Sequence, residues 1–175
     1  GDRLGSHCLD GQLSKSAAGP KLRGKAAPYA TAFRIPLIVR WPQRIPSGQV
    51  CDALVNSVDL TPTILELAGV PAIPKLPGDS MASWCVDGTG PNNAGVWIGL
   101  GNWRAVWDGR YIYARGGGYN HLFDHKHDPH ELHNLMSSDD HIAERARLHQ
   151  LLLQLAAGAD DPMLDQLHNM KPIDE

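Results

Sequence analysis

The sequence lacks any block of like charge. Its 16 lysines and arginines stand against 19 aspartates and glutamates, which gives a formal net charge of −3 over 175 residues. Proteins that bind nucleic acid normally carry a basic patch or stripe, so we expect no nucleic-acid partner. Hydrophobic residues make up 42% of the chain, which is enough for a real core in one domain of ordinary size.

Long apolar runs are also missing. No stretch approaches the roughly 20 apolar residues that a membrane-spanning helix needs, so we expect no membrane span in this chain. The first residues do not form the basic segment followed by an apolar one that marks a signal peptide. The compartment therefore stays open, and the protein would be periplasmic or secreted if a signal peptide lies upstream of Gly1.

Cysteine is scarce. Cys8, Cys51 and Cys85 lie far apart, and no two of them have the spacing of a zinc or redox site. We expect free thiols that act as small apolar fillers. One pair could form a disulfide in an oxidising compartment, but the odd count leaves at least one thiol over.

The first half contains the signals of an α/β domain. Residues 34–42 form a short apolar run bounded by prolines, which predicts a strand buried on both faces, as in a mainly parallel sheet. A helix is predicted after it, with Asp59 or Thr61 as its cap, Pro62 in its first turn and Gly69 as its stop. A buried strand followed by an amphipathic helix is typical of α/β architecture.

The second half has a different pattern. Residues 70–101 are rich in Pro, Gly and Asn and predict a long connection. Two aromatic and β-branched runs flank the Asp108-Gly109 pair, which predicts a β-hairpin. A further strand runs into a turn at Asp128-Pro129, and a helix with an apolar stripe begins near residues 138–140. The leucines of that stripe are Leu148, Leu151, Leu152 and Leu155.

Lys25 is the first residue that could carry chemistry. It follows a glycine and precedes the predicted buried strand, and α/β sheets build their sites at strand ends. Its ammonium group would then suit an anion. Lysine is also among the most exposed residue types, so the spacing alone favours a solvated loop lysine.

A resemblance to a known family decides between these two interpretations of Lys25. A glycine and Lys25, then Tyr29, Arg34 and Pro36, lead into "PLIVRWP" and on to "VDLTPTILELAG", and this series resembles the sulfatase family, the arylsulfatase-like members of the alkaline phosphatase superfamily. The stretches "RAVWDGRYIYAR" and "LFDHKHDPHELHNL" resemble the C-terminal hairpin and the Asp-Pro, Glu and Asn-Leu stretch of the same family. The resemblance covers nearly the whole chain.

The resemblance implies the C-terminal part of an alkaline phosphatase-like sulfatase. The expected fold class is α/β, with an incomplete α/β layer followed by a small antiparallel sheet and a C-terminal helix. Residues 1–75 would be the C-terminal part of the large α/β domain and residues 76–101 a connection. Residues 102–175 would form the small antiparallel-sheet subdomain with its helix.

The implied activity is hydrolysis of a sulfate ester on a small molecule or a carbohydrate. In this family a Cys or Ser in a Cys/Ser-x-Pro-x-Arg motif becomes formylglycine, whose hydrate attacks sulfur, while calcium and cationic side chains neutralise the sulfate oxygens. None of the three cysteines lies in such a motif. The opening residues from Gly1 to His7 resemble the segment that follows the family's calcium-binding turn. The nucleophile and the calcium ligands are therefore expected upstream of Gly1, and this chain alone is expected to be inactive.

The resemblance assigns a role to two residues. Lys25 matches the lysine that donates to the sulfate, a catalytic and substrate-binding role. His7 matches a histidine that either lines the substrate pocket or hydrogen-bonds the loop. Two departures stand out, because residues 10–21 form an insertion with lysines of its own and Ala30 replaces a frequent Glu. Without that carboxylate, Arg34 would need another partner if it were buried.

Two further questions stay open at this point. The four histidines of "DHKHDPHELHN" suggest a metal site, but their spacing does not match His-Glu-x-x-His, so we interpret them as a solvated turn and predict no metal ligand in this chain. The same cation chemistry also suits a phosphonate or phosphate ester hydrolase of the superfamily, and a catalytically inactive sulfatase-like module is the third alternative.

Overall fold

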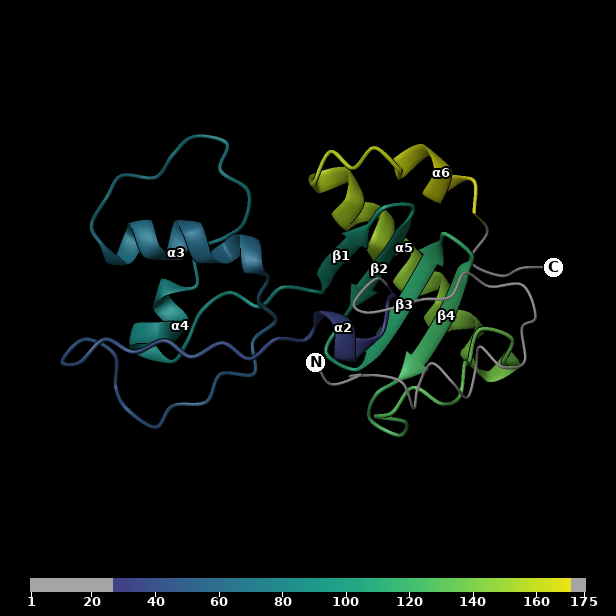
Figure 1. Cartoon of the computed structure of the whole chain (residues 1–175), viewed down its shortest axis with the longest axis horizontal. Coiled ribbons are helices and arrows are strands. Elements are labelled where there is room, and N and C mark those ends of the chain that lie inside the picture. The colour runs from purple at the N-terminus through teal and green to yellow at the C-terminus, as the bar shows by residue number, and fades with distance from the viewer. Residues whose placement is uncertain (1–26, 171–175) are drawn as a thin grey trace, which may run out of the picture. The chain divides into compact units, whose positions relative to one another are not determined.

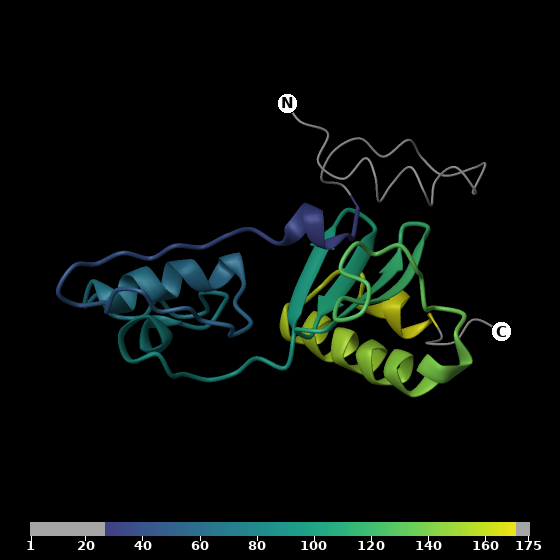
Figure 2. The ribbon, with the colours of Figure 1, turned by 90° about the horizontal axis from the view of Figure 1, so that it is seen from below.

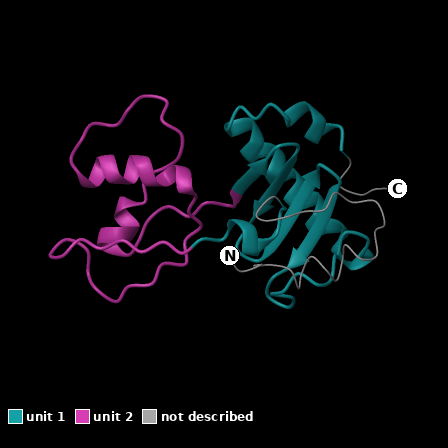
Figure 3. Ribbon diagram, viewed as in Figure 1, with its two compact units in different colours: residues 1–35, 97–175 teal, residues 36–96 magenta. Residues whose placement is uncertain are grey.

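The computed structural model describes residues 27–170. These residues fall into two compact units, one containing residues 27–35 and 97–170 and the other containing residues 36–96 (Figure 3). No helix among residues 27–170 is long and apolar enough to cross a membrane.

The first unit is built on a four-stranded sheet with the strand order β1-β2-β3-β4 (Figure 1). Its strands are β1 (Val96–Leu100), β2 (Trp103–Trp107), β3 (Tyr111–Gly116) and β4 (Tyr119–Asp124). The pairs β2–β3 and β3–β4 are antiparallel. The predicted hairpin is confirmed, because Asp108 accepts hydrogen bonds from the amides of Arg110 and Tyr111 and Gly109 has a φ of 96°.

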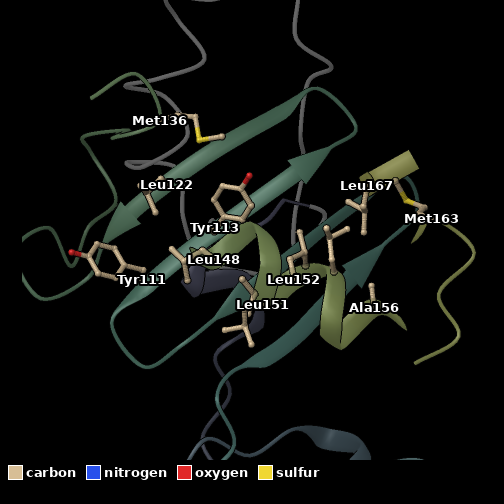
Figure 4. Packing of buried hydrophobic residues seen from close by; sticks show 12 residues of the cluster. Tyr111, Tyr113, Leu122, Met136, Leu148, Leu151, Leu152, Ala156, Met163 and Leu167 are labelled. Atoms are coloured by element: carbon tan, nitrogen blue, oxygen red, sulfur yellow. The ribbon is translucent and has the colours of Figure 1, made fainter. Parts of the chain in front are cut away.

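One face of this sheet packs on helix α5 (Ile142–Gly158), which is the predicted C-terminal helix (Figure 4). The 3-10 turn η2 (Asp139–His141) precedes α5, close to the predicted start, and α6 (Leu164–His168) follows it. Side chains alternate along β2, β3 and β4, so every second one points into this core. Its fully buried members are Val106, Tyr113, Leu122, Leu148, Leu152, Ala156 and Leu167.

The opposite face of the sheet is covered by residues 27–33, which include the short helix α2 (Ala30–Phe33) (Figure 2). Ala27, Tyr29 and Phe123 form a buried cluster there, with Tyr119 packed against it. The segment that follows Lys25 in the sequence is thus part of the same unit as the C-terminal sheet.

The second unit contains the 3-10 turn η1 (Ser57–Asp59) and the helices α3 (Leu60–Leu67) and α4 (Ala82–Asp87). The predicted helix and its stop at Gly69, with a φ of 69°, are confirmed. Asp59 stands at the N-cap position of α3, but its side chain makes no cap bond to that helix. The Asp59 carboxylate instead accepts hydrogen bonds from the amides of Asn56 at 2.7 Å and Asp79 at 3.0 Å, which fixes a loop 20 residues away.

The buried strand predicted for residues 34–42 does not form. The segment has no strand assignment, and its apolar side chains are exposed, 64% for Ile35 and 89% for Ile38. A strand needs a neighbouring strand to satisfy its amides and carbonyls, and no strand among residues 27–170 pairs with this one. The predicted connection of residues 70–101 also contains elements that its composition hid, namely α4 and β1.

Candidate functional site

Both predicted site residues, Lys25 and His7, lie outside the described residues. The described chain begins two positions after Lys25, and it is buried from its first residue. Ala27 is 2% exposed, and Tyr29 and Ala30 are each 5% exposed. The backbone that leads away from Lys25 is therefore seated in a core.

Aromatic rings hold the first part of this segment. The Tyr29 ring lies 5.4 Å from the His121 ring and 5.8 Å from the Phe123 ring, measured between centroids. Such ring pairs add to the stability gained from buried area alone. Burial lowers the pKa of His121 to about 4, so this imidazole is neutral at neutral pH and presents an uncharged surface to Tyr29.

A buried carboxylate holds the next part. The amide of Ala30 donates to both oxygens of Glu131, at 3.0 Å to Oε1 and 3.2 Å to Oε2. The Nε2 atom of His125 lies 3.2 Å from the same Oε1. Glu131 is only 1% exposed, and this burial raises its pKa to about 7.

Arg34 is the last residue of this segment and lies at the surface of the first unit. Its guanidinium lies over the Trp107 ring at 5.5 Å, and the edge of the His125 ring meets Trp107 at 5.2 Å. Arg34 is exposed, so it does not need the carboxylate that Ala30 lacks. Its positive charge acts on Glu131 and lowers the pKa of that carboxyl, against the larger opposing effect of burial.

Three of the four clustered histidines contact different carboxylates, and His125 is the one beside Glu131. His127 Nδ1 bonds the Asp124 carboxylate at 2.8 Å, and His133 Nδ1 lies 3.5 Å from Asp128. Asp124 also accepts two hydrogen bonds from Arg110, and these hold the pKa of its carboxyl well below the usual range. Within residues 27–170, no three His, Cys, Asp or Glu side chains gather as a metal ion would require.

The cysteines divide by exposure. Cys85 is buried, as expected of an apolar filler, and burial raises the pKa of its thiol. Cys51 is free as predicted but exposed, so it fills no core. Cys8 lies outside the described residues.

Glu131 is the residue that sequence reasoning missed. It stands in the Asp-Pro, Glu and Asn-Leu stretch, but the amide it binds lies 101 residues earlier, and no local periodicity reports such a pair. Ala30 is the one available signal. At this position, where the resemblance leads us to expect a carboxylate, the Ala30 amide instead binds the carboxylate of Glu131.

Comparison of the sequence with known proteins finds similarity to sulfatases. The family model described as N-sulphoglucosamine sulphohydrolase, C-terminal, matches residues 23–94. The uncharacterised sulfatase YidJ of Escherichia coli is 27% identical over 98% of this chain, which corresponds to 33% of YidJ. The N-acetylglucosamine-6-O-sulfatase of Bacteroides thetaiotaomicron is 28% identical over 71% of this chain and 25% of its own length.

Solved structures share the fold. One protein, solved in complex with its substrate D-glucosamine-2-N,6-O-disulfate, aligns with a TM-score of 0.68 at 22% identity, over 75% of this chain and 30% of its own. The phosphonate monoester hydrolase of Silicibacter pomeroyi also aligns with a TM-score of 0.68, at 24% identity, over 81% of this chain and 32% of its own. The chain spans a third or less of the length of the curated relatives it matches. It shares the fold of these solved neighbours over the aligned part, and its sequence is similar to sulfatases, with the family model matching residues 23–94.

Proposed function

We propose that the native protein containing this chain is a sulfuric ester hydrolase that acts on a small-molecule or carbohydrate sulfate ester. The observation that carries the proposal is the likeness to a sulfatase over 98% of the chain. The family match supports it too, because its model begins at residue 23, beside Lys25. A relative that is an N-acetylglucosamine-6-O-sulfatase favours a sulfated sugar as the substrate class.

Lys25 is the proposed sulfate contact. An ammonium group held near a developing sulfate charge stabilises the transition state electrostatically, and it must be positioned to do so. The turn after Lys25 is buried on the sheet through Ala27, Tyr29 and Ala30, which supports the idea that the lysine is delivered from a fixed point. His7 is proposed to line the same pocket.

Formylglycine and calcium are proposed to come from elsewhere in the native protein. Residues 27–170 offer no group of three metal-ligating side chains, and the described cysteines lie in no Cys-x-Pro-x-Arg motif, so we derive no step through either group here. When bound, the calcium would help to neutralise the sulfate oxygens. On this view, the 175-residue chain alone hydrolyses no sulfate ester.

The exposed apolar segment of residues 34–42 fits the same proposal. Apolar side chains on both faces of an extended run are the pattern of a strand in a covered parallel sheet. We propose that strands outside the described residues pair with it in the native protein. The exposures of Ile35 and Ile38 would then fall to those of core residues.

A phosphonate or phosphate ester hydrolase is the second candidate function. The structural likeness to a phosphonate monoester hydrolase favours it, because sulfate and phosphonate esters present similar tetrahedral oxygens to the same cations. The third reading, a catalytically inactive sulfatase-like module, predicts turnover of neither ester.

The test is hydrolysis of paired nitrophenyl esters by the native full-length protein. We expect turnover of nitrophenyl sulfate, and of a 6-O-sulfated glucosamine, to exceed that of nitrophenyl phenylphosphonate. Lys25→Ala should lower kcat/KM on the order of 100-fold or more, as does the loss of one oxyanion donor. Lys15→Ala, from the inserted stretch, is the matched control and should keep its activity. Faster phosphonate turnover, or a silent Lys25→Ala, would refute the assignment.

A further inference from the structure

The first unit contains a buried carboxylate for which the proposed chemistry has no use. Glu131 is 1% exposed and lies in a turn with a φ of 55°. A residue other than glycine is strained in this left-handed region, and a buried carboxyl is unfavourable unless it is hydrogen-bonded. The surrounding contacts must therefore outweigh both costs.

The Glu131 amide donates to the Asp128 carbonyl at 3.1 Å, and the side-chain contacts of Glu131 face the segment that follows Lys25 and the strand ends beneath it. The two carboxylate oxygens of Glu131 share the Ala30 amide, and Oε1 also meets His125 at 3.2 Å. His125 is itself held by its own amide, which donates to the Arg110 carbonyl at 2.9 Å, and its ring packs on Trp107. The carboxylate is thus fixed from the sheet side and reaches out to one backbone amide.

The Ala30 amide lies in a turn whose backbone is held by internal hydrogen bonds. Ala30 is five residues after Lys25, and the Tyr29 carbonyl accepts the Ala32 amide at 2.8 Å while the Ala30 carbonyl accepts the Arg34 amide at 2.8 Å. The turn of residues 29–34 is therefore internally bonded. Tyr29 fixes it on the aromatic face of the sheet and Glu131 fixes its backbone, so that it cannot slide along that face without losing one of them.

We propose that Glu131 is a positioning residue for sulfate-ester hydrolysis: by accepting the Ala30 amide, it fixes the turn that delivers Lys25 to the sulfate. The inference rests on the proposed function of Lys25. It adds that the C-terminal subdomain contributes to catalysis through one buried carboxyl group. This group does not touch the substrate, and it acts only by holding the backbone of the segment after Lys25.

Two substitutions at Glu131 separate the effect of side-chain length from the effect of charge. Glu131→Gln keeps the length of the side chain, and its amide oxygen can still accept from Ala30 while its amide nitrogen donates to neutral His125. Glu131→Asp keeps the charge but is one methylene shorter, so it loses the Ala30 amide. Positioning predicts that Gln is tolerated and Asp is not. A role for the negative charge predicts the reverse.

Hydrogen exchange of the native full-length protein tests the anchoring without any substrate. Glu131→Asp should speed amide exchange in residues 29–34, whereas Glu131→Gln should leave it unchanged. The matched control is Asp161→Asn, which weakens the buried Arg104–Asp161 pair where α5 turns into α6. It should speed exchange near residue 161 but not in residues 29–34. Unchanged exchange in Glu131→Asp, or an equal rise in Asp161→Asn, would overturn the anchoring.

A double-mutant cycle with Lys25→Ala tests the link to catalysis, using nitrophenyl sulfate as the substrate. Glu131→Asp should lower kcat on the order of 10- to 100-fold with a smaller change in KM, because a small misplacement of a positioned group has this effect. In the Lys25→Ala background the same change should lower kcat little further. An equal loss in both backgrounds would show that Glu131 acts independently of Lys25 and would overturn the proposal.

The outcomes also separate this inference from the proposed function. If the native protein hydrolyses no sulfate ester, the proposed function fails, and the exchange data alone decide whether Glu131 anchors the turn. If it hydrolyses sulfate esters and Lys25→Ala is silent, both the sulfate contact and the positioning role are overturned. If Lys25→Ala is damaging and Glu131→Asp is as active as the parent protein, the positioning role alone is overturned.

Discussion

Replacing Glu131 with glutamine should change how the stability of the chain depends on pH. The Glu131 carboxyl has its pKa raised from 4.5 to about 7, chiefly by burial. In the unfolded chain it loses its proton near pH 4.5, while in the folded chain it keeps it until about pH 7. Between these values the folded state binds more protons, so the free energy of unfolding falls as pH rises.

The size of the effect follows from that pKa. A rise in pKa from 4.5 to about 7 corresponds to about 3 kcal/mol of folding stability. This stability is fully present below about pH 4.5 and is lost above about pH 7. The glutamine side chain would mimic the protonated carboxyl at every pH. The stability of Glu131→Gln minus that of the parent chain should therefore rise from near zero at about pH 4.5 to about 3 kcal/mol at about pH 8.

Neighbouring groups should not hide this difference. Asp128 and Arg34 act on the Glu131 carboxyl in opposite directions. His125 has its pKa lowered by burial and by Arg34, so its own contribution to stability increases with pH. These groups are present in both chains, and most of their effect cancels in the comparison.

The assay is urea unfolding of both chains between about pH 4.5 and 8, followed by tryptophan fluorescence. A flat difference across this range would refute the reasoning. It would mean that Glu131 ionises normally despite its burial, with a protonated His125 as its partner. A parent chain that gains stability over Glu131→Gln as pH rises would contradict the sign.

Three further outcomes follow from the packing. Leu152→Ala, at a fully buried position of α5, should lower the free energy of unfolding by about 2–5 kcal/mol in urea titrations, and a loss below about 1 kcal/mol would mean that the core is not formed as described. Gly78→Ala should lower the melting temperature of the second unit, because the added Cβ would lie 2.6 Å from a backbone oxygen at a φ of +89°; an unchanged value would contradict that close approach. Cys51 should react with a thiol reagent in the native chain while Cys85 reacts only after unfolding, and equal native rates would contradict the assigned burial.

The hairpin and the C-terminal helix were predictable because their signals are local. The Asp108-Gly109 pair sets the turn, and the leucine stripe sets the face of α5 that meets the sheet. Alternation along a strand and the 3.6-residue repeat of a helix depend only on neighbours in the sequence. The start of α5 was found for the same reason, to within a few residues of the turn at Asp139–His141.

The strand predicted for residues 34–42 shows where local signals end. Its composition fits a covered strand, but pairing depends on a neighbour that the local sequence cannot specify, and its side chains are exposed. The Asp59 carboxylate is a similar case. The sequence placed it correctly at a helix start, whereas the fold uses it to hold the amide of Asp79.

The sequence by itself determined the family resemblance, the hairpin, the helices at residues 60–67 and 142–158, and the candidacy of Lys25 and His7. Only the tertiary structure decided that residues 27–34 lie on the C-terminal sheet and that Glu131 holds the Ala30 amide. Short-range patterns arise from backbone geometry, which repeats within a few residues. A hydrogen bond between residues 101 positions apart arises from the packing of whole elements, and no stretch of sequence near either partner contains that information.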